Sequence, residues 1–377
     1  MKLITSEAVS IGHPDKVADQ ISDAMLDECL KQDGNSRVAV ETMVTTNTVF
    51  LAGEVTTHAD VDVDNLVRGV VKDIGYDFDG FDYNNLTISR HIHRQSPDIA
   101  MGVDRDGAGD QGMMFGYAEG DATTNYLPIP IYYSQALMKE LQYRRENCDW
   151  GMRNLRPDAK CQITYDDDSG RIRTIVVSHQ HNESMSNDEF RLEAIDTIME
   201  VIPERLLMPL EFLTADDGRV LDRTFVFLNP TGRFVEGGPS ADTGLTGRKI
   251  VVDTYGGVGK IGGGAFSGKD PTKVDRSAAY MCRYVAKNLV ASGKCRKAEV
   301  AVAYAIGVAE PVQISVNTFG TGYDAQLTEY VKKNYDFRPK AIIEKLGLRK
   351  PNGWCYRDTA KNGHFTNCSF PWEKIEK

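Results

Sequence analysis

Hydrophobic residues recur every three or four positions in several stretches of the chain, which is the spacing of one face of an α-helix. The first helix is predicted over residues 14–30, where Pro14 suits the first helical position. A second long helix is predicted over residues 272–291, opened by Asp270 and Pro271. Two shorter stretches with the same spacing predict further helices, over residues 188–201 and 324–333.

Other stretches are rich in Val, Thr and Phe, which favour β-strands. Residues 38–45 and 49–56 flank the turn-like run Thr46-Asn47-Thr48, so they predict a hairpin. Further strands are predicted in five runs, at 161–165, 172–178, 224–228, 249–255 and 299–306. Helices interspersed with paired strands indicate an α+β architecture, with sheets covered on one side by helices. No internal sequence repeat is detectable.

Length and composition restrict the possible partners. With 377 residues, 41% of them hydrophobic, the chain can fill the cores of two or three domains. A formal net charge of -10 argues against partners that bind through phosphate backbones or anionic lipids, so we expect no nucleic acid and no membrane. No signal-like segment and no run of about 18 apolar residues is present, which predicts a cytoplasmic protein. The scattered cysteines predict neither a disulfide framework nor a zinc site.

The run Gly12-His13-Pro14-Asp15-Lys16 places an imidazole, a carboxylate and an ammonium group at a helix start. The N-terminus of a helix attracts anions, so this run is a candidate anion site. A capped helix in which Asp15 complements the helix dipole explains the same residues. The pentapeptide alone leaves both interpretations open.

Two acidic residues of the predicted hairpin form a second candidate. If Asn47-Thr48 is the two-residue loop, Glu41 lies directly opposite Glu54. Opposed carboxylates destabilise a sheet unless they are solvated or bridged by a cation or an amino group. A solvated outer face is one interpretation. We favour a functional pair, which would suit a cation and the ammonium group of an amino acid.

The glycine-rich run over residues 262–270 can bring backbone amides close to phosphate oxygens. From Gly263 its spacing matches a P-loop, but Asp270 replaces the magnesium-binding Ser or Thr, and Pro271 interrupts the helix entry. We therefore do not expect an ordinary P-loop. Two cations one helical turn apart and a nearby carboxylate suit a metal-bound polyphosphate: Lys269, Lys273 and Asp275.

Further basic residues are scattered along the chain. Taken singly, each of these basic residues is typical of a solvated surface. Phe234, beside Arg233, would by itself be interpreted as a core residue. The basic residues lie at Lys160, two residues after Asp158, at Arg233 beside Phe234, and at Arg248 and Lys249 after Asp242.

Three motifs occur in order: GHPDK at 12–16, GAGDQG at 107–112 and GGGAFSGKD at 262–270. Together with QSPDI at 95–99 and GLTGRKI at 244–250, they resemble the S-adenosylmethionine synthetase (methionine adenosyltransferase) family. The combination is highly specific and spans essentially the whole chain.

The resemblance implies three similar α/β-sandwich domains about a pseudo-threefold axis, with the chain crossing between domains. Approximate divisions are 1–99, 112–234 and 235–377, and residues 95–106 correspond to a mobile active-site loop. The resemblance also implies a homodimer or homotetramer with active sites at the subunit interface.

The implied reaction joins ATP and L-methionine. The methionine sulfur attacks C5′ of ATP and expels the triphosphate, which is then cleaved to pyrophosphate and phosphate. Negative charge develops on the departing oxygen, so cations and metals should dominate catalysis. The family pattern implies two magnesium ions per active site and a potassium ion.

Residue by residue, the resemblance assigns four catalytic groups: His13 beside the leaving oxygen, and Lys160, Arg248 and Lys269 on the triphosphate. Further ATP contacts fall on Lys249, Asp110 at the ribose, Phe234 at the adenine, and Arg233, Asp158, Asp242 and Ala265 nearby. The methionine pocket falls on Glu54, Gln95, Lys273 and again Asp242. Metal ligands fall on Asp15 and Asp275 for magnesium, Glu41 for potassium and, more weakly, Glu7 for magnesium.

Two departures from the family pattern concern the loop and position 11. The run Met101–Asp106 is shorter than expected, and Ile11 stands where the family usually has glutamate.

Two rival functions are a phosphotransferase using residues 263–270 and a regulatory paralogue that binds ATP and methionine without turnover. Asp270-Pro271 disfavours the first, and the retained His13 and Lys269 disfavour the second.

Overall fold

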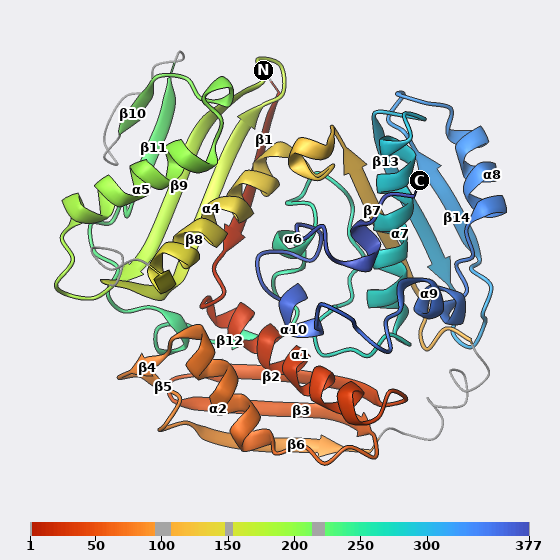
Figure 1. Cartoon of the computed structure of the whole chain (residues 1–377), viewed down its shortest axis with the longest axis horizontal. Helices are drawn as coiled ribbons and strands as arrows, with labels where there is room; N and C mark the ends of the chain where they lie inside the picture. The colour runs from red at the N-terminus through yellow and green to blue at the C-terminus, as the bar shows by residue number, and fades with distance from the viewer. Residues whose placement is uncertain (1, 95–106, 148–153, 213–222, 377) are drawn as a thin grey trace.

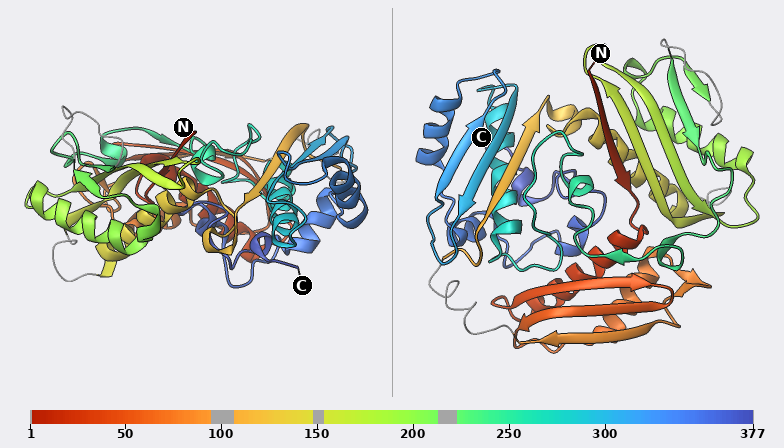
Figure 2. Two further views of the ribbon diagram at one scale, coloured as in Figure 1. Left: turned by 90° about the horizontal axis from the view of Figure 1, so that it is seen from above. Right: turned by 180° about the vertical axis from the view of Figure 1, so that it is seen from behind.

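The computed structural model describes residues 2–94, 107–147, 154–212 and 223–376. Three separate β-sheets surround a central segment built from the C-terminal part of the chain (Figure 1). The sheets lie on one broad side of the molecule, and the helices that cover them lie on the other (Figure 2). Within the described residues, no helix combines the length and the apolar character that crossing a bilayer requires.

The largest sheet has five strands in the order β1-β8-β9-β11-β10. Their bounds are β1 Leu3–Val9, β8 Leu155–Asp166, β9 Arg171–His181, β10 Leu210–Phe212 and β11 Thr224–Leu228. Helices α4 (Ile129–Asn147) and α5 (Asn187–Val201) cover one face and bury its apolar side chains. The other face is open to solvent, as one-sided helical cover predicts.

The second sheet has the order β12-β2-β3-β6. Its strands are β2 Arg37–Thr45, β3 Thr48–Thr56, β6 Thr87–His93 and β12 Gly244–Leu245, with a small hairpin of β4 (Asp77–Phe78) and β5 (Phe81–Asp82) nearby. Helices α1 (Pro14–Gln32) and α2 (Val63–Ile74) cover its inner face (Figure 1).

The third sheet has the order β14-β13-β7, with strands β7 Gly112–Glu119, β13 Lys297–Tyr304 and β14 Gln313–Asn317. Helix α7 (Val274–Ala291) lies directly on it, since a Cβ added at Gly116 would come within 2.0 Å of the α7 backbone. The remaining helices are α6 Ile250–Asp253, α8 Asp324–Asn334, α9 Pro339–Leu346 and α10 Tyr356–Thr359.

Each sheet combines strands that are far apart in the sequence. β1 pairs with β8, β7 pairs with β13, and β12 pairs with β2. The chain therefore crosses between the three units, and the α+β architecture is confirmed. The linear division at 1–99, 112–234 and 235–377 remains a prediction.

The helices predicted over 14–30, 188–201, 272–291 and 324–333 are confirmed, with ends shifted by three residues or fewer. The strand predicted over 249–255 is wrong, because α6 occupies Ile250–Asp253. Three consecutive β-branched residues favour a strand, but tertiary contacts override this propensity. The helical turn buries Val252 and brings Asp253 to 2.6 Å from the Lys16 ammonium group.

The hairpin is confirmed, but its predicted register is wrong. Thr45 pairs with Thr48, so Glu41 lies opposite Ala52 and Glu54 opposite Ala39. Asn47 supplies the turn with φ 42°, a left-handed conformation that asparagine tolerates. Its side chain accepts the Asp82 N–H, a tertiary contact that local sequence does not reveal. The two glutamates are diagonal neighbours on one exposed face, not directly opposed.

Candidate active site

The start of α1 presents a buried, neutral imidazole. His13 caps the helix, and its Nδ1 accepts the Asp15 N–H at 3.2 Å. Burial and the neighbouring Lys249 ammonium group together lower the pKa of His13 to about 3, and the Asp15 carboxylate, which acts to raise it, does not offset them. Because Nδ1 is an acceptor, Nε2 carries the proton of the neutral ring. His13 can therefore donate a hydrogen bond without carrying charge.

Asp15 is the centre of the first charged cluster. Its Oδ2 lies 2.6 Å from Lys249 Nζ, and its Oδ1 lies 3.3 Å from Arg248 Nε and accepts the Leu245 N–H at 2.9 Å. Burial would raise the pKa of Asp15, but the hydrogen bonds from Lys249 and Leu245 outweigh it and hold the pKa below its usual range. Asp15 is therefore ionised and surrounded by cations.

A second charged cluster lies in the glycine-rich loop before α7. Lys269 Nζ lies 2.6 Å from Asp275 Oδ2. A Cβ added at Gly264 would come within 2.3 Å of the Asp275 carboxylate, so the loop backbone lies against this pair. Gly247, with φ 81°, approaches Ala265 so closely that a Cβ there would meet the Ala265 Cβ at 2.5 Å. The two basic loops therefore touch each other.

Strand β8 contributes two further charged residues near the first cluster, Asp158 and Lys160. Asp158 accepts the Gly238 N–H at 2.8 Å, and its other carboxylate oxygen is buried without a partner among the described residues. Burial raises the pKa of Asp158 to about 6, while Lys160 acts to lower it and Asp242 to raise it. Lys160 also lowers the pKa of His13. These residues therefore share one electrostatic environment.

Other residues assigned by sequence lie outside these clusters. Glu41 and Glu54 lie on the outer face of the β2–β3 hairpin, where His93 Nε2 is 3.2 Å from Glu54 Oε1. Glu7 is exposed on β1, opposite Gln162.

The remaining assigned residues pair locally or are not described. Arg233 pairs with Glu183 at the surface at 2.7 Å, and the N–H of the adjacent Phe234 donates to His181. Lys273 directly precedes α7 and pairs with the buried Asp270 at 2.6 Å. Asp110 is exposed. Gln95 and the predicted loop 95–106 lie outside the described residues.

Sequence reasoning missed two buried carboxylates that contact the site loops. Asp19 accepts the Gly247 N–H and Asp23 accepts the Gly268 N–H, at 2.8 and 2.9 Å. The signal was present in the sequence, because aspartates recur every four residues from Asp15 to Asp27 along a helix. Such a row of like charges is unfavourable on one helix unless each is paired.

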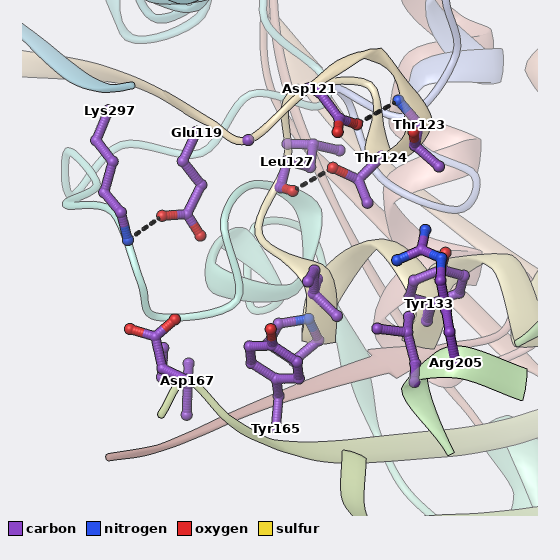
Figure 3. Close-up of a pocket in the computed structure, with 15 residues that line it drawn as sticks. Glu119, Asp121, Thr123, Thr124, Leu127, Tyr133, Tyr165, Asp167, Arg205 and Lys297 are labelled. Carbon is purple, nitrogen blue, oxygen red and sulfur yellow. Dashed lines mark hydrogen bonds and ion pairs between the residues drawn. The ribbon is translucent and has the colours of Figure 1, made fainter. Parts of the chain in front are cut away.

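A cavity of about 230 Å³ lies elsewhere, between the end of β7 and the start of α4 (Figure 3). Its apolar wall includes Tyr133 and Tyr165, and at its edge Lys297 pairs with Glu119 at 2.6 Å. None of the residues assigned above lines this cavity. The charged clusters, not this cavity, therefore form the candidate active site.

The carboxylates suit metal ions that are shared with a phosphate ligand. The described residues contain no group of three or more His, Cys, Asp or Glu side chains that could hold a metal alone. Magnesium usually takes only one or two protein carboxylates and completes its shell with phosphate oxygens and water. Asp15 and Asp275 each offer one carboxylate beside basic side chains, which fits this mode of binding.

Comparisons with known proteins agree with this chemistry along the whole chain. Models of the N-terminal, central and C-terminal domains of S-adenosylmethionine synthetase match residues 1–97, 105–234 and 236–374. The S-adenosylmethionine synthase of Staphylococcus epidermidis is 50% identical over an alignment of 401 positions that covers 100% of this chain and 96% of the relative. That of Clostridium tetani is 49% identical over 399 positions, covering 100% and 97%. The chain belongs to the S-adenosylmethionine synthetase family.

Proposed function

We propose that this chain transfers the adenosyl group of ATP to the sulfur of L-methionine by direct attack at C5′, and then hydrolyses the triphosphate to pyrophosphate and phosphate. Synthesis of S-adenosylmethionine from ATP and methionine by a metal-dependent enzyme is the activity of the family. The observation that carries the finer proposal is the pair of Lys–Asp contacts, Lys249 with Asp15 and Lys269 with Asp275, on two touching loops.

The proposed catalysis is mainly electrostatic. As the C5′–O bond breaks, negative charge accumulates on the triphosphate, and fixed cations stabilise that charge. Lys160, Arg248, Lys249 and Lys269 would bind phosphate oxygens. Asp15 and Asp275 would hold two magnesium ions, which supply further positive charge beside the phosphates. Glu7 is a weaker candidate for the same role.

His13 would act as a hydrogen-bond donor to the leaving oxygen. Its neutral ring carries the proton on Nε2, since Nδ1 accepts the Asp15 N–H. A neutral donor can stabilise the developing oxyanion and keep its own proton, so no acid titration near neutral pH is required.

The remaining assignments are also proposals. Nucleotide contacts would come from Asp110, Asp158, Arg233, Phe234, Asp242 and Ala265. Methionine contacts would come from Glu54, Gln95, Asp242 and Lys273, and Glu41 would bind potassium. Carboxylate oxygens suit both a potassium ion and a ligand ammonium group.

We also propose a homodimer, alone or paired into a tetramer, in which two chains complete each active site. His13 starts α1, which covers the inner face of the β2–β3 sheet, whereas Glu41 and Glu54 lie on its outer face. The sheet therefore separates these glutamates from the His13 of their own chain. The outer face also exposes Met43 and Phe50, each 37% accessible, which suits burial against a second copy.

Phe50→Glu is expected to convert the dimer to a monomer of 41.9 kDa and to abolish most of the activity. A carboxylate that replaces an apolar side chain and becomes buried between two chains is strongly unfavourable. Light scattering would give the mass, with Leu192→Glu, at an exposed position on α5, as the matched control. A Phe50→Glu protein that remains dimeric would contradict this interface.

Gly264→Ala is expected to raise the magnesium concentration for half-maximal rate by about tenfold or more. The new Cβ would lie 2.3 Å from the Asp275 carboxylate and displace it from Lys269. Gly263→Ala is the matched control, since a Cβ there meets nothing within 4 Å. Equal magnesium dependence in the two variants would remove Asp275 from the proposed metal site.

Direct attack at C5′ can be tested by stereochemistry. ATP made chiral by deuterium at C5′ should give S-adenosylmethionine with inverted configuration, because one in-line displacement inverts the carbon. Retention would indicate an intermediate bound to the enzyme and would overturn the single-displacement proposal.

A further inference from the structure

Helix α1 carries a row of four aspartates, each four residues after the previous one: Asp15, Asp19, Asp23 and Asp27. The first three are buried, with side chains no more than 1% accessible. Carboxylates one turn apart on a helix repel each other, and burial adds a desolvation cost. Such a row persists only where each member has compensating partners, so the partners indicate what the row does.

Each aspartate of the row accepts backbone N–H groups from a segment far from α1 in the sequence, and the first two accept from the same loop. Their donors are, in order, Leu245, Gly247, Gly268, and the pair Tyr356 and Arg357. The first two donors precede Arg248 and Lys249, and the third precedes Lys269. One rigid helix thus anchors both loops that carry the basic residues of the site.

Asp23 and Arg276 hold the Lys269 segment from two sides. Both guanidinium Nη atoms of Arg276 donate to Asp23, at 2.6 and 2.9 Å, and Nη1 also donates to the Lys269 carbonyl at 3.2 Å. Asp23 in turn accepts the Gly268 N–H at 2.9 Å. Arg276 directly follows Asp275 in α7. One buried ion pair therefore fixes the backbone of both Lys269 and Asp275.

Asp19 fixes the backbone of the other loop, which carries Arg248 and Lys249. Its Oδ1 accepts the Gly247 N–H at 2.8 Å, and its Oδ2 accepts from Lys16 at 2.9 Å. Lys16 also donates to Asp253 of α6 at 2.6 Å, on the far side of Arg248 and Lys249. The segment from Gly247 to Asp253 is therefore held at both ends by α1.

We propose that Asp19 and Asp23, with Arg276, are positioning residues that set the distance between the Arg248–Lys249 loop and the Lys269 loop. They act through the backbone of these loops, because their side chains are buried and contact the Gly247 N–H, the Gly268 N–H and the Lys269 carbonyl. The inference rests on the proposed triphosphate site and deepens it. Displacement of a binding group by about 1 Å can lower a rate about 100-fold, so the anchors control catalysis without touching substrate.

A purely structural role is the alternative, since any buried ion pair can affect stability. The chain offers a matched control farther along α7, the helix that also carries Arg276. Arg283 of α7 makes an equally buried two-bond pair with Glu373, at 2.8 and 2.9 Å, and this pair contacts neither basic loop. Glu373→Gln therefore damages a similar ion pair away from the site.

The test compares Asp23→Asn with Glu373→Gln in the full-length protein. We expect Asp23→Asn to lower kcat per folded molecule about 10- to 100-fold, with KM for methionine within about twofold of wild type. Glu373→Gln should lose thermal stability to a similar extent but keep kcat within about twofold. Circular dichroism supplies the folded fraction.

If Asp23→Asn does not fold, Arg276→Lys and Asp19→Asn provide the test. Lysine keeps the charge opposite Asp23 but lacks the planar fork that also reaches Lys269, so kcat should fall in the same way. Asp19→Asn should lower kcat less than Asp23→Asn, because Lys16 keeps its second carboxylate partner, Asp253, at 2.6 Å. Wild-type kcat in any folded variant of Asp23 or Arg276, or equal losses in Glu373→Gln, would overturn the proposal. A wild-type protein without synthetase activity would instead overturn the proposed function.

Discussion

Replacing Lys269 with alanine is expected to lower kcat about 100- to 1,000-fold while the protein stays folded. Lys269 pairs with Asp275 at 2.6 Å, and both side chains are about three-quarters buried. We expect the ammonium group to stabilise the charge that forms on the departing triphosphate. That charge is larger in the transition state than in bound ATP, so the loss should fall on kcat rather than on KM for methionine.

A nearby lysine provides the control. Lys260 lies in the same glycine-rich region but pairs with Glu299 at 2.9 Å and has a side chain that is 66% accessible. Lys260→Ala should keep kcat within about twofold of wild type. Steady-state kinetics with saturating ATP and methionine measure both variants. Wild-type kcat in Lys269→Ala would remove this residue from the proposed triphosphate clamp.

Replacing His13 with alanine is expected to lower kcat about 100-fold or more, because the leaving oxygen would lose its hydrogen-bond donor. Burial lowers the pKa of His13 to about 3, well below the ordinary value of 6.5. The ring is therefore neutral throughout the physiological range and gains its proton only when the pH falls towards that lowered pKa. The wild-type rate should show no His13 titration between about pH 5.5 and 8.

The pH profile separates a neutral donor from a general acid. His13→Gln retains an N–H donor without an ionisable ring, so it should keep more activity than His13→Ala and show the same pH profile as wild type. If His13 instead acted as an imidazolium acid, wild-type kcat would fall with rising pH through an ionisation absent from His13→Gln. That result would overturn the neutral-donor role.

Local pattern predicted the elements of this fold well, because apolar periodicity and turn residues act over a few positions. The long helix after Pro14 and the hairpin around Asn47 both form. What local pattern did not predict depends on distant contacts. The hairpin register is set where Asn47 meets Asp82, and the helical turn of α6 forms where Asp253 meets Lys16. Neither partner is visible in the sequence near the element.

In the candidate site, too, local motifs predicted the residues but not their contacts with distant segments. Motifs identified Asp15 and Lys249 separately, yet nothing local to either residue predicts that they lie 2.6 Å apart. The pairing arises because α1 anchors the backbone at Leu245 and Gly247. The contact of Glu54 with His93 at 3.2 Å was also not predicted, because it joins two strands of the sheet that are far apart in the sequence. The charged residues of the site were therefore predictable from residue types, whereas the distances between them depend on the assembled fold.

One measurement tests the central claim most directly. The purified chain would be incubated with ATP, L-methionine, magnesium and potassium, and the products quantified by chromatography. We predict S-adenosylmethionine, pyrophosphate and phosphate in equal amounts, with no ADP. Formation of ADP with a phosphorylated acceptor, or binding of both substrates without any product, would contradict the account.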